Sequence, residues 1–277
     1  MSGIDKAVIL AAGRGNRIAD AARGVPKPLL PLDGHAGSPT FLDWHLTMLS
    51  RVGCREIYLV GNRDTFGTHL AAMDHVAATW ILNPTEDLST SGSAHSAQYA
   101  WHSAHRILDG RSRVLLMDAD ILYDPALLHR LATQRGTRSK TLVSAHHDPG
   151  DEEVLVFARP DDRSRAVLHG KGLLGSPLAD GLVCVGEATG ILLFEPSAHA
   201  ALAAATDWAI QRSGGGTRSE HEEVTQLLMA RGDVDIVTFD DAAFMECDTP
   251  EEYAVLREDL YPRLRHHLTP TLSRSGG

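Results

Sequence analysis

The sequence is poor in cysteine and in long apolar runs. Its three cysteines, Cys54, Cys184 and Cys247, lie far apart and form no CxxC pair. This spacing excludes a zinc knuckle, argues against a disulfide framework and favours a reducing compartment. No window approaches the roughly 18 apolar residues that span a bilayer, and the first residues lack the basic and apolar regions of a leader. We therefore expect a cytoplasmic protein with no membrane partner.

Positive charge is also scarce. The 277 residues include 36 acidic and 26 basic side chains, which gives a net charge of −10. A nucleic-acid binder is expected to lean the other way, so we expect no nucleic-acid partner. Any anionic ligand must be held by a local basic site or a metal, because the overall field repels it. Aromatic residues make up only 5%, which leaves little material for an aromatic cage around a quaternary ammonium group.

Short apolar runs alternate with amphipathic stretches in the first half of the chain. The pattern predicts strands at residues 7–10, 56–60, 79–82 and 114–117, and helices at 40–52, 68–76, 93–108 and 125–133. Ser38 and Pro39 are expected to open the first of these helices, with proline at its first position. This alternation predicts an α/β fold with a parallel sheet covered on both faces.

The second half changes character. Short strands at 141–145, 154–159, 166–168 and 182–185 are expected to add to the sheet edge in antiparallel fashion. Further strands are predicted at 191–194 and 234–239, and helices at 198–205, 220–229 and 251–267. Neither an internal repeat nor a linker is visible, so we expect residues 1–277 to form a single domain.

A glycine-rich turn follows the first strand. Gly13 and Gly15 would let backbone N–H groups approach an anion closely. Arg17 and Lys27 could add positive charge against phosphate oxygens. Taken alone, the turn fits neither GxxxxGK[ST] nor GxGxxG, and a purely structural turn explains it equally well.

The glycine turn and the lysine segment together are more specific. LAAGxGxR followed by PKPLLPL resembles the signature of nucleotidyltransferases with a Rossmann-like sheet, over roughly residues 5–256. The resemblance implies a mixed, mainly parallel sheet flanked by helices, as in nucleotide-diphospho-sugar transferases. It also implies that Arg17 and Lys27 neutralise a nucleoside triphosphate during catalysis. Asn16 stands where threonine is usual. The implied nucleotide-binding loop is Leu10, Ala11, Ala12, Gly13, Arg14, Gly15 and Asn16.

Two acidic segments are candidates for a metal site. In VLLMDADILYDP, a buried strand delivers Asp118 and Asp120 to the sheet edge where ligands usually bind, and carboxylates there suit Mg²⁺. A turn or capping role suits Asp124 better. The resemblance places the metal aspartate at Asp120 and leaves Asp118 as a second ligand or a hydrogen-bonded support near the nucleotide.

The second acidic segment is FMECDTPEEY. On composition alone Asp248 reads as a capping residue, because Thr249 and Pro250 form a helix start. The resemblance reverses that reading, since related enzymes carry a DTxED segment whose aspartate completes the metal site. It therefore implies Mg²⁺ bound by Asp120 and Asp248.

A segment rich in small hydroxyl residues surrounds Gly92 before a predicted helix. Exposed N–H groups at a helix start favour anionic or carbonyl acceptors, although a polar loop with a helix cap explains the pattern as well. The segment resembles one in phosphocholine and phosphonate cytidylyltransferases that contacts cytosine and ribose. This resemblance implies CTP as the nucleotide, contacted by Ser91, Gly92 and Ser96.

Further residues resemble acceptor-binding positions of the same relatives. Lys171 stands where a lysine faces the acceptor phosphate, and Glu187 matches a GExxG segment. Glu222 and Glu223 resemble a helical carboxylate pair that can face a cationic substrate tail. An exposed loop lysine and solvated helix carboxylates are the alternatives. His221 stands where some choline-type relatives carry tyrosine, which favours a phosphonate over phosphocholine.

These features together predict a Mg²⁺-dependent cytidylyltransferase. It would transfer CMP from CTP to a small phosphonate or a phosphocholine-like phosphomonoester and release pyrophosphate. Residues 1–140 would form the half that binds CTP and metal, and residues 141–277 the half that binds the acceptor. The alternatives are a sugar-1-phosphate nucleotidyltransferase and an inactive, nucleotide-sensing relative. A homodimer is a further hypothesis.

Overall fold

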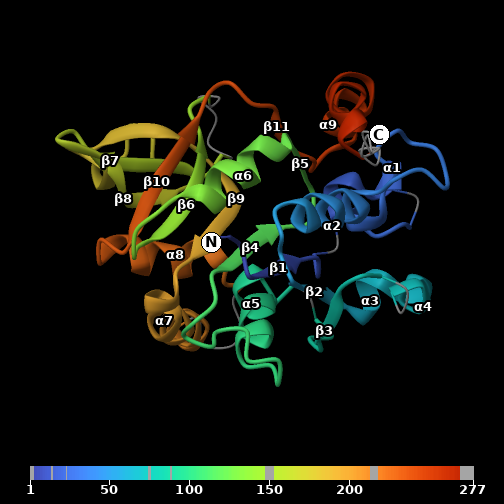
Figure 1. The fold of residues 1–277 in the computed structure, drawn as a ribbon, viewed down its shortest axis with the longest axis horizontal. Coiled ribbons are helices and arrows are strands. Elements are labelled where there is room, and N and C mark those ends of the chain that lie inside the picture. Colours follow the sequence, from blue (N-terminus) through green and yellow to red (C-terminus); the bar gives the residue numbers. More distant parts are fainter. Residues whose placement is uncertain are drawn as a thin grey trace, which may run out of the picture.

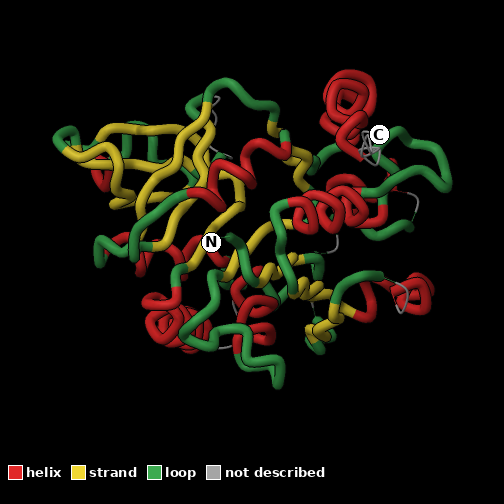
Figure 2. Tube along the Cα trace, in the orientation of Figure 1, coloured by secondary structure: helices red, strands yellow, loops and turns green. Residues whose placement is uncertain are grey.

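The structure is a computed structural model that describes residues 3–13, 15–22, 24–73, 76–87, 89–146, 153–212 and 218–268. A large sheet runs through the centre of the molecule, and helices cover it on both sides (Figures 1 and 2). None of the helices in the described ranges combines the length and the apolar character that crossing a bilayer requires.

The first half of the chain forms four parallel strands in the order β3-β2-β1-β4. The strands are β1 (Lys6–Leu10), β2 (Glu56–Asn62), β3 (Thr79–Asn83) and β4 (Val114–Asp118). Alternate side chains of β1 enter different cores: Ile9 packs on one face of the sheet, and Val8 on the other. The apolar runs of the sequence therefore form strands buried on both faces, as predicted.

The second half closes strands into a ring. Within the described residues, β9 pairs with both β6 and β7, and the order β9-β6-β10-β8-β7 returns to β9. The expectation of antiparallel additions at the sheet edge is wrong for β6, which lies inside the sheet, parallel to β10 and antiparallel to β9. The bounds are β6 (Ser139–Ser144), β7 (Leu155–Arg159), β8 (Asp162–Gly170), β9 (Val183–Phe194) and β10 (Val234–Phe239).

Strand β9 joins the two halves. The segments predicted as separate strands at 182–185 and 191–194 form this one strand, because the glycines between them bend the chain without ending it. Gly186 and Gly190 have φ values of 150° and 69°. Beyond this bend, β9 pairs with β4, so that Leu193 lies opposite Leu115.

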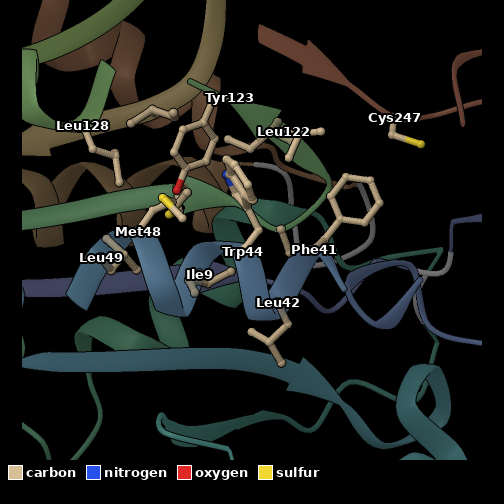
Figure 3. Packing of buried hydrophobic residues seen from close by; sticks show 14 of the residues in the cluster. Ile9, Phe41, Leu42, Trp44, Met48, Leu49, Leu122, Tyr123, Leu128 and Cys247 are labelled. Carbon is tan, nitrogen blue, oxygen red and sulfur yellow. The ribbon is translucent and has the colours of Figure 1, made fainter. Parts of the chain in front are cut away.

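Two hydrophobic cores fill the spaces between the sheet and its helices. One face packs against α2, α6 and the C-terminal helical run, and the other against α5, α7 and α8. Figure 3 shows Trp44 of α2 in the first core beside Tyr123, with ring centroids 6.4 Å apart. The helices are α1 (Ala19–Ala22), α2 (Phe41–Arg51), α3 (Arg63–Phe66), α4 (Leu70–Met73), α5 (Ser93–Trp101), α6 (Pro125–Thr133), α7 (His199–Arg212), α8 (His221–Ala230), α9 (Pro250–Val255) and α10 (Tyr261–Leu264).

Helix boundaries differ from the predictions where side chains intervene. Helix α5 ends at Trp101 instead of extending to residue 108, because Ser103 Oγ donates to the Ala100 carbonyl and Arg106 adopts a φ of 53°. Helix α2 begins after Thr40, whose hydroxyl accepts from Asp43 N. Pro39 therefore precedes the helix and does not occupy its first position.

Two other helical predictions also change. The helix expected at 68–76 is a series of short turns from residue 63 to residue 73. Asn62 caps the first of them, and Gly67 interrupts it with a φ of 45°. Helix α7 continues seven residues beyond the predicted end at residue 205, as far as Arg212. The predicted C-terminal helix is present from 250 to 268 and includes a π-helical turn at Leu256–Leu260.

Candidate active site

A second, two-stranded sheet brings together the two acidic segments of the sequence. Strand β5 (Ile121–Tyr123) pairs with β11 (Phe244–Glu246) in antiparallel register, with Glu246 opposite Ile121. The pairing continues as Cys247 N donates to the Asp120 carbonyl at 3.0 Å. Asp120 precedes one strand and Asp248 follows the other, so the same ladder sets them side by side. Strand β5 was not predicted from the sequence.

The start of helix α9 leaves the Asp248 side chain available to the site. Thr249 is the residue that caps α9: its hydroxyl accepts from Glu252 N at 3.2 Å. The Glu252 carboxylate in turn accepts from the backbone N–H groups of Asp248 and Thr249, at 2.6 and 2.8 Å. The capping role that composition suggested for Asp248 is therefore wrong, because Thr249 and Glu252 form the capping box.

Lys27 bridges the two aspartates. Its Nζ lies 2.6 Å from Asp120 Oδ2 and 2.5 Å from Asp248 Oδ1, and its side chain is only 9% exposed. Burial alone would lower the pKa of Lys27, but the two carboxylates raise it above its usual value. Arg17 forms a second ion pair with Asp248. A lysine held charged between two carboxylates places positive and negative groups within reach of the same ligand.

Glu246 joins Asp120 and Asp248 in an acidic cluster. One carboxylate oxygen from each lies within 4.8 Å of the others. Desolvation, followed by repulsion from Asp120 and Asp248, raises the pKa of Glu246. Glu246 belongs to the sequence segment that resembles the metal-binding segment of related enzymes, but the sequence analysis gave it no role. The signal for such a role is its position two residues before Asp248 at the end of a short strand, which places both side chains on one side.

The glycine turn follows β1 at the same edge of the sheet. Ala11 and Ala12 are buried, and Ala11 N donates to the Val60 carbonyl at 2.8 Å. Gly15 has a left-handed φ of 60° and leads into a 3₁₀ turn at Asn16–Ile18. Gly13 is exposed. Arg14, the remaining predicted member of this loop, lies outside the described residues.

The predicted cytosine-binding segment rests on a buried asparagine. Asn83, at the end of β3, donates through Nδ2 to Ser91 Oγ and Ser96 Oγ, both at 3.1 Å. Ser91 and Ser96 are themselves buried. Gly92 precedes helix α5 and packs so closely against Ser219 that an added Cβ would overlap the Ser219 carbonyl.

A cleft of about 760 Å³ opens beside the acidic cluster. It brings together several predicted residues from both halves of the chain. These are Arg17, Asp118, Lys171, Glu187, Glu222 and Asp248. Among the described residues, the glycine turn up to Asn16 and the Ser91–Gly92–Ser96 segment do not line this cleft, and Glu223 lines a separate groove beside Trp208.

Two histidines line the cleft. His169, 8% exposed, makes a 2.7 Å hydrogen bond through Nε2 with the Glu222 carbonyl. Nε2 donates, because a carbonyl oxygen can only accept, and burial lowers the pKa of His169. His221 places Nε2 4.0 Å from Asp118 Oδ2. Burial lowers the pKa of His221, but nearby carboxylates, with Glu222 and Asp118 foremost, outweigh burial and raise it. Sequence reasoning gave His169 no role.

Comparison with known proteins fits this geometry. A model of the MobA-like NTP transferase domain matches residues 7–180, which include the glycine turn, Lys27 and Asp120. The chain belongs to the MobA-like NTP transferase family. This match confirms the predicted membership of a nucleotidyltransferase family. Glu187, Glu222 and Asp248 lie beyond the residues that this family match covers.

Curated relatives of this NTP transferase act on different acceptors. The chain is 35% identical over 130 residues to CMP-5'-(3-aminopropyl)phosphonate synthase of Streptomyces rubellomurinus, a match covering 46% of this chain and 19% of that protein. The chain thus spans about a fifth of that relative's length. It is also 34% identical over 185 residues to N-acetylmuramate alpha-1-phosphate uridylyltransferase of Neisseria meningitidis, covering 60% of this chain and 69% of that protein.

A solved structure confirms the predicted fold class. The inositol-1-phosphate CTP transferase from T. maritima superimposes with a TM-score of 0.68 and 18% identity, over 92% of this chain and 95% of that one. This NTP transferase therefore has an α/β fold with a large mixed sheet flanked by helices. Its parallel pairings lie mainly among the first four strands, whereas most of those beyond β4 are antiparallel.

Proposed function

We propose that this chain is a Mg²⁺-dependent cytidylyltransferase that transfers CMP from CTP to a small phosphonate and releases pyrophosphate. The observation that carries the proposal is the placement of the Lys27–Asp120–Asp248 group next to the cleft lined by Lys171, Glu187 and Glu222. A charged group suited to a triphosphate and a separate polar cleft suited to an acceptor are what transfer between two anions requires.

The acidic cluster fits a magnesium ion. Mg²⁺ prefers carboxylate oxygens and keeps several waters and substrate phosphate oxygens as further ligands. Asp120 and Asp248 would hold the ion, and Glu246 offers a third oxygen within 4.8 Å of the other two. Mg²⁺ bound there would neutralise charge on the reacting phosphates.

The basic side chains would act on the nucleotide. Lys27 and Arg17 contact Asp248 in the structure, so both lie beside the proposed metal ligands. In the proposed reaction an ionised phosphonate oxygen attacks the α-phosphorus of CTP. A new P–O bond forms as the bond between the α-phosphorus and the bridging oxygen breaks, and pyrophosphate leaves with that bonding pair. Lys27 and Arg17 would stabilise the negative charge on the triphosphate and on pyrophosphate.

The cleft supports an amino-bearing acceptor. Apart from Glu246 and Asp248, which would hold the metal, its described lining contains the carboxylates Asp118, Glu153, Glu187, Glu222 and Glu252, against the basic side chains Arg17, Lys171 and His221. Lys171 would bind the phosphonate, while Glu187 and Glu222 would face a cationic distal group. Phe244 is the only Phe, Tyr or Trp among the described lining residues, which disfavours a cage for trimethylammonium. The aminopropylphosphonate named in the Streptomyces relative's product agrees with this charge pattern.

We further propose that residues 1–277 act as one nucleotidyltransferase domain in the cytoplasm. The continuous pairing of β9 with strands of both halves supports the single domain. Cys54, Cys184 and Cys247 are not joined in disulfides, in agreement with a reducing compartment.

Pyrophosphate release tests the proposed function. CTP, UTP, ATP and GTP are crossed with 2-aminoethylphosphonate, 2-hydroxyethylphosphonate, phosphonoformate, phosphocholine and glucose 1-phosphate in the presence of Mg²⁺. We expect turnover with CTP and the aminophosphonate, abolished by Asp120→Ala or by EDTA. Turnover with phosphocholine but with no phosphonate would overturn the acceptor assignment. Folded, nucleotide-binding protein that releases no pyrophosphate in any combination would favour an inactive sensing relative.

A sugar-1-phosphate uridylyltransferase is the second candidate. The observation that favours it is the Neisseria relative, which this chain matches over 69% of that protein's length. Adding N-acetylmuramate 1-phosphate and UTP to the same assay separates the two candidates. A kcat/KM at least tenfold higher with this pair than with CTP and any phosphonate would replace the first proposal.

A further inference from the structure

The first turns of helices α5 and α8 cap each other, although they lie 128 residues apart in the sequence. Ser93 donates to Glu220 Oε2 twice, through its backbone N at 2.8 Å and through Oγ at 2.7 Å. In return, His221 N donates to Ser93 Oγ at 2.7 Å. Each helix therefore satisfies a backbone donor of its first turn with a side chain from the other helix.

The Ser93 hydroxyl is fully used in this arrangement. A hydroxyl group has one proton to donate and two lone pairs to accept with. Its proton goes to Glu220, and the two lone pairs accept from His221 N and from His221 Nδ1, the latter at 3.0 Å. His221 Nδ1 must therefore carry a proton. We refer to Ser93, Glu220 and His221 as the cross-cap.

Close backbone packing leaves the cross-cap little freedom to slide. Ala94 N donates to the Ser219 carbonyl at 3.1 Å. Next to it, Gly92 touches the same residue so closely that any side chain would overlap the Ser219 carbonyl. A shift of the first turn of α5 must therefore be accommodated by the first turn of α8.

The start of α5 lies beside residues that are predicted to bind the nucleotide, and the start of α8 carries a residue of the cleft. On the α5 side, Ser91 and Ser96 flank the cross-cap and rest on Asn83. On the α8 side, Glu222 lines the cleft, and its carbonyl is bonded to His169 of β8. Gln226 adds two bonds to the same strand: Oε1 accepts from His169 N at 2.8 Å, and Nε2 donates to the Val167 carbonyl at 3.1 Å.

From this geometry we propose that the cross-cap couples the nucleotide side of the site to the acceptor side, so that bound nucleotide strengthens acceptor binding. Nucleotide held at the start of α5 fixes Ser93, and Ser93 fixes the turn of α8 that carries Glu222. The acceptor then binds a turn that is already ordered, so its binding loses less conformational entropy. Ser93 and Glu220 act as positioning residues. The inference rests on the proposed function in assigning the start of α5 to the nucleotide and the cleft beside Glu222 to the acceptor.

Hydrogen exchange tests the coupling without any acceptor. Amide exchange in α5 (Ser93–Trp101) and α8 (His221–Ala230) is measured with and without nucleotide and Mg²⁺, using CTP, UTP, ATP and GTP separately so that the result does not depend on which nucleotide binds. We expect the bound nucleotide to slow exchange in the first turns of both helices. In Ser93→Ala the slowing should persist in α5 and disappear from α8, whereas Ser93→Thr, which keeps the hydroxyl, should restore it.

The matched control is Glu223→Ala, which changes an exposed carboxylate on the first turn of α8 outside the cross-cap. It should leave the slowing in α8 unchanged. Protection confined to α5 in the unmodified protein would overturn the coupling. Protection of α8 that survives in Ser93→Ala would overturn the role of the cross-cap.

Equilibrium binding then measures the size of the effect. The dissociation constant for aminoethylphosphonate is determined with and without a non-hydrolysable CTP analogue, and the reverse titration must give the same ratio. We expect a ratio between about fivefold and about 150-fold, falling to about one in Ser93→Ala. A ratio near one in the unmodified protein, or one unchanged in Ser93→Ala, contradicts the inference. If the protein turns over a different acceptor, the proposed function fails, and the same ratio measured with that acceptor still decides the coupling.

Discussion

The two halves of the sheet differ in strand arrangement and in how their charged side chains are paired. The β3-β2-β1-β4 half is a parallel array whose edge carries the glycine turn and Lys27, and its cations are already paired: Lys27 lies between two carboxylates, and Arg17 lies on one of them. The β9-β6-β10-β8-β7 half curls into a ring beside a cleft in which carboxylates outnumber cations. The cations of the first half are held in place by their partners, whereas the cleft of the second half offers a ligand more carboxylates than cations.

This difference indicates how specificity is divided. Under the proposed function, the half with paired cations would bind the triphosphate, which every acceptor requires equally. An unbalanced cleft discriminates, because an acceptor of the wrong charge leaves buried polar groups unpaired. Substitutions in the first half should therefore reduce turnover with every acceptor, and substitutions in the second should change the order of preference among acceptors.

The largest effect is expected for Lys27→Ala. Removing a preorganised charge from a site of phosphoryl transfer typically lowers kcat by about 10²–10³-fold, and we expect a loss of this size with every acceptor. Steady-state pyrophosphate release provides the measurement. A loss of kcat with one acceptor only would contradict the proposal that the first half acts on the nucleotide and the second half selects the acceptor.

Arg55→Ala is the control for this substitution. Arg55 forms an exposed ion pair with Asp5, before the first residue of β2 and thus at the opposite end of the parallel strands. An exposed pair of this kind contributes little. We expect activity within about twofold of the unmodified protein and a similar melting temperature.

An intermediate effect is expected for Gly190→Ala, where the two halves meet. Gly190 lies on β9 with a φ of 69°, and an added Cβ would overlap the Asp118 carboxylate of β4. The left-handed backbone costs about 1 kcal/mol or more, and displacement of Asp118 should lower kcat by up to about 10²-fold. Thermal unfolding measures the loss of stability, and initial rates measure the loss of kcat.

Gly53→Ala separates backbone strain from the collision with Asp118. Gly53 also has a positive φ, 79°, but its Cβ would meet nothing within 4 Å. It should lose stability and keep full activity. Equal losses of activity in the two alanine variants would show that Asp118 is not the cause.

The smallest effect is expected for Glu222→Gln. Removing one partly exposed carboxylate from the cleft should raise the KM for an aminophosphonate by about tenfold, with little change in the KM for CTP. The KM for a hydroxyethylphosphonate should change less, because its distal group carries no charge. Glu223→Gln, one residue along the same helix but outside the cleft, should change neither value.

The sequence predicted the strands of the parallel half well, because each is a local apolar run, whereas the helices expected at 68–76 and 93–108 end earlier than predicted. Buried apolar runs became β1 and β4, and Asp124 with Pro125 began α6 where expected. The resemblance predicted nucleotidyltransferase membership, which the family match confirms. The roles of individual site residues, such as Asp120 and Lys171, stay predictions.

What the sequence could not predict depends on pairing between distant segments. Strand β5 is three residues long and forms only because β11 lies beside it. Glu246 enters the acidic cluster through that same pairing. The central place of β6 likewise depends on β9 and β10, which come more than forty residues later. Local periodicity in the sequence contains no information about which of these strands pair with each other.

The return of β9 into the sheet also has a consequence for how the chain is synthesised and folds. One edge of β4 pairs with β9, which follows about eighty residues later in the chain, since Val114 pairs with Phe194. That edge stays unpaired until β9 has been synthesised. Pairings of such long range slow folding, and until they form an unpaired strand edge is open to intermolecular association. A fragment that ended at residue 180, where the family match ends, would lack β9 altogether. Such a fragment would carry the glycine turn, Lys27 and Asp120 and still present the bare edges of β4 and β6 to other chains.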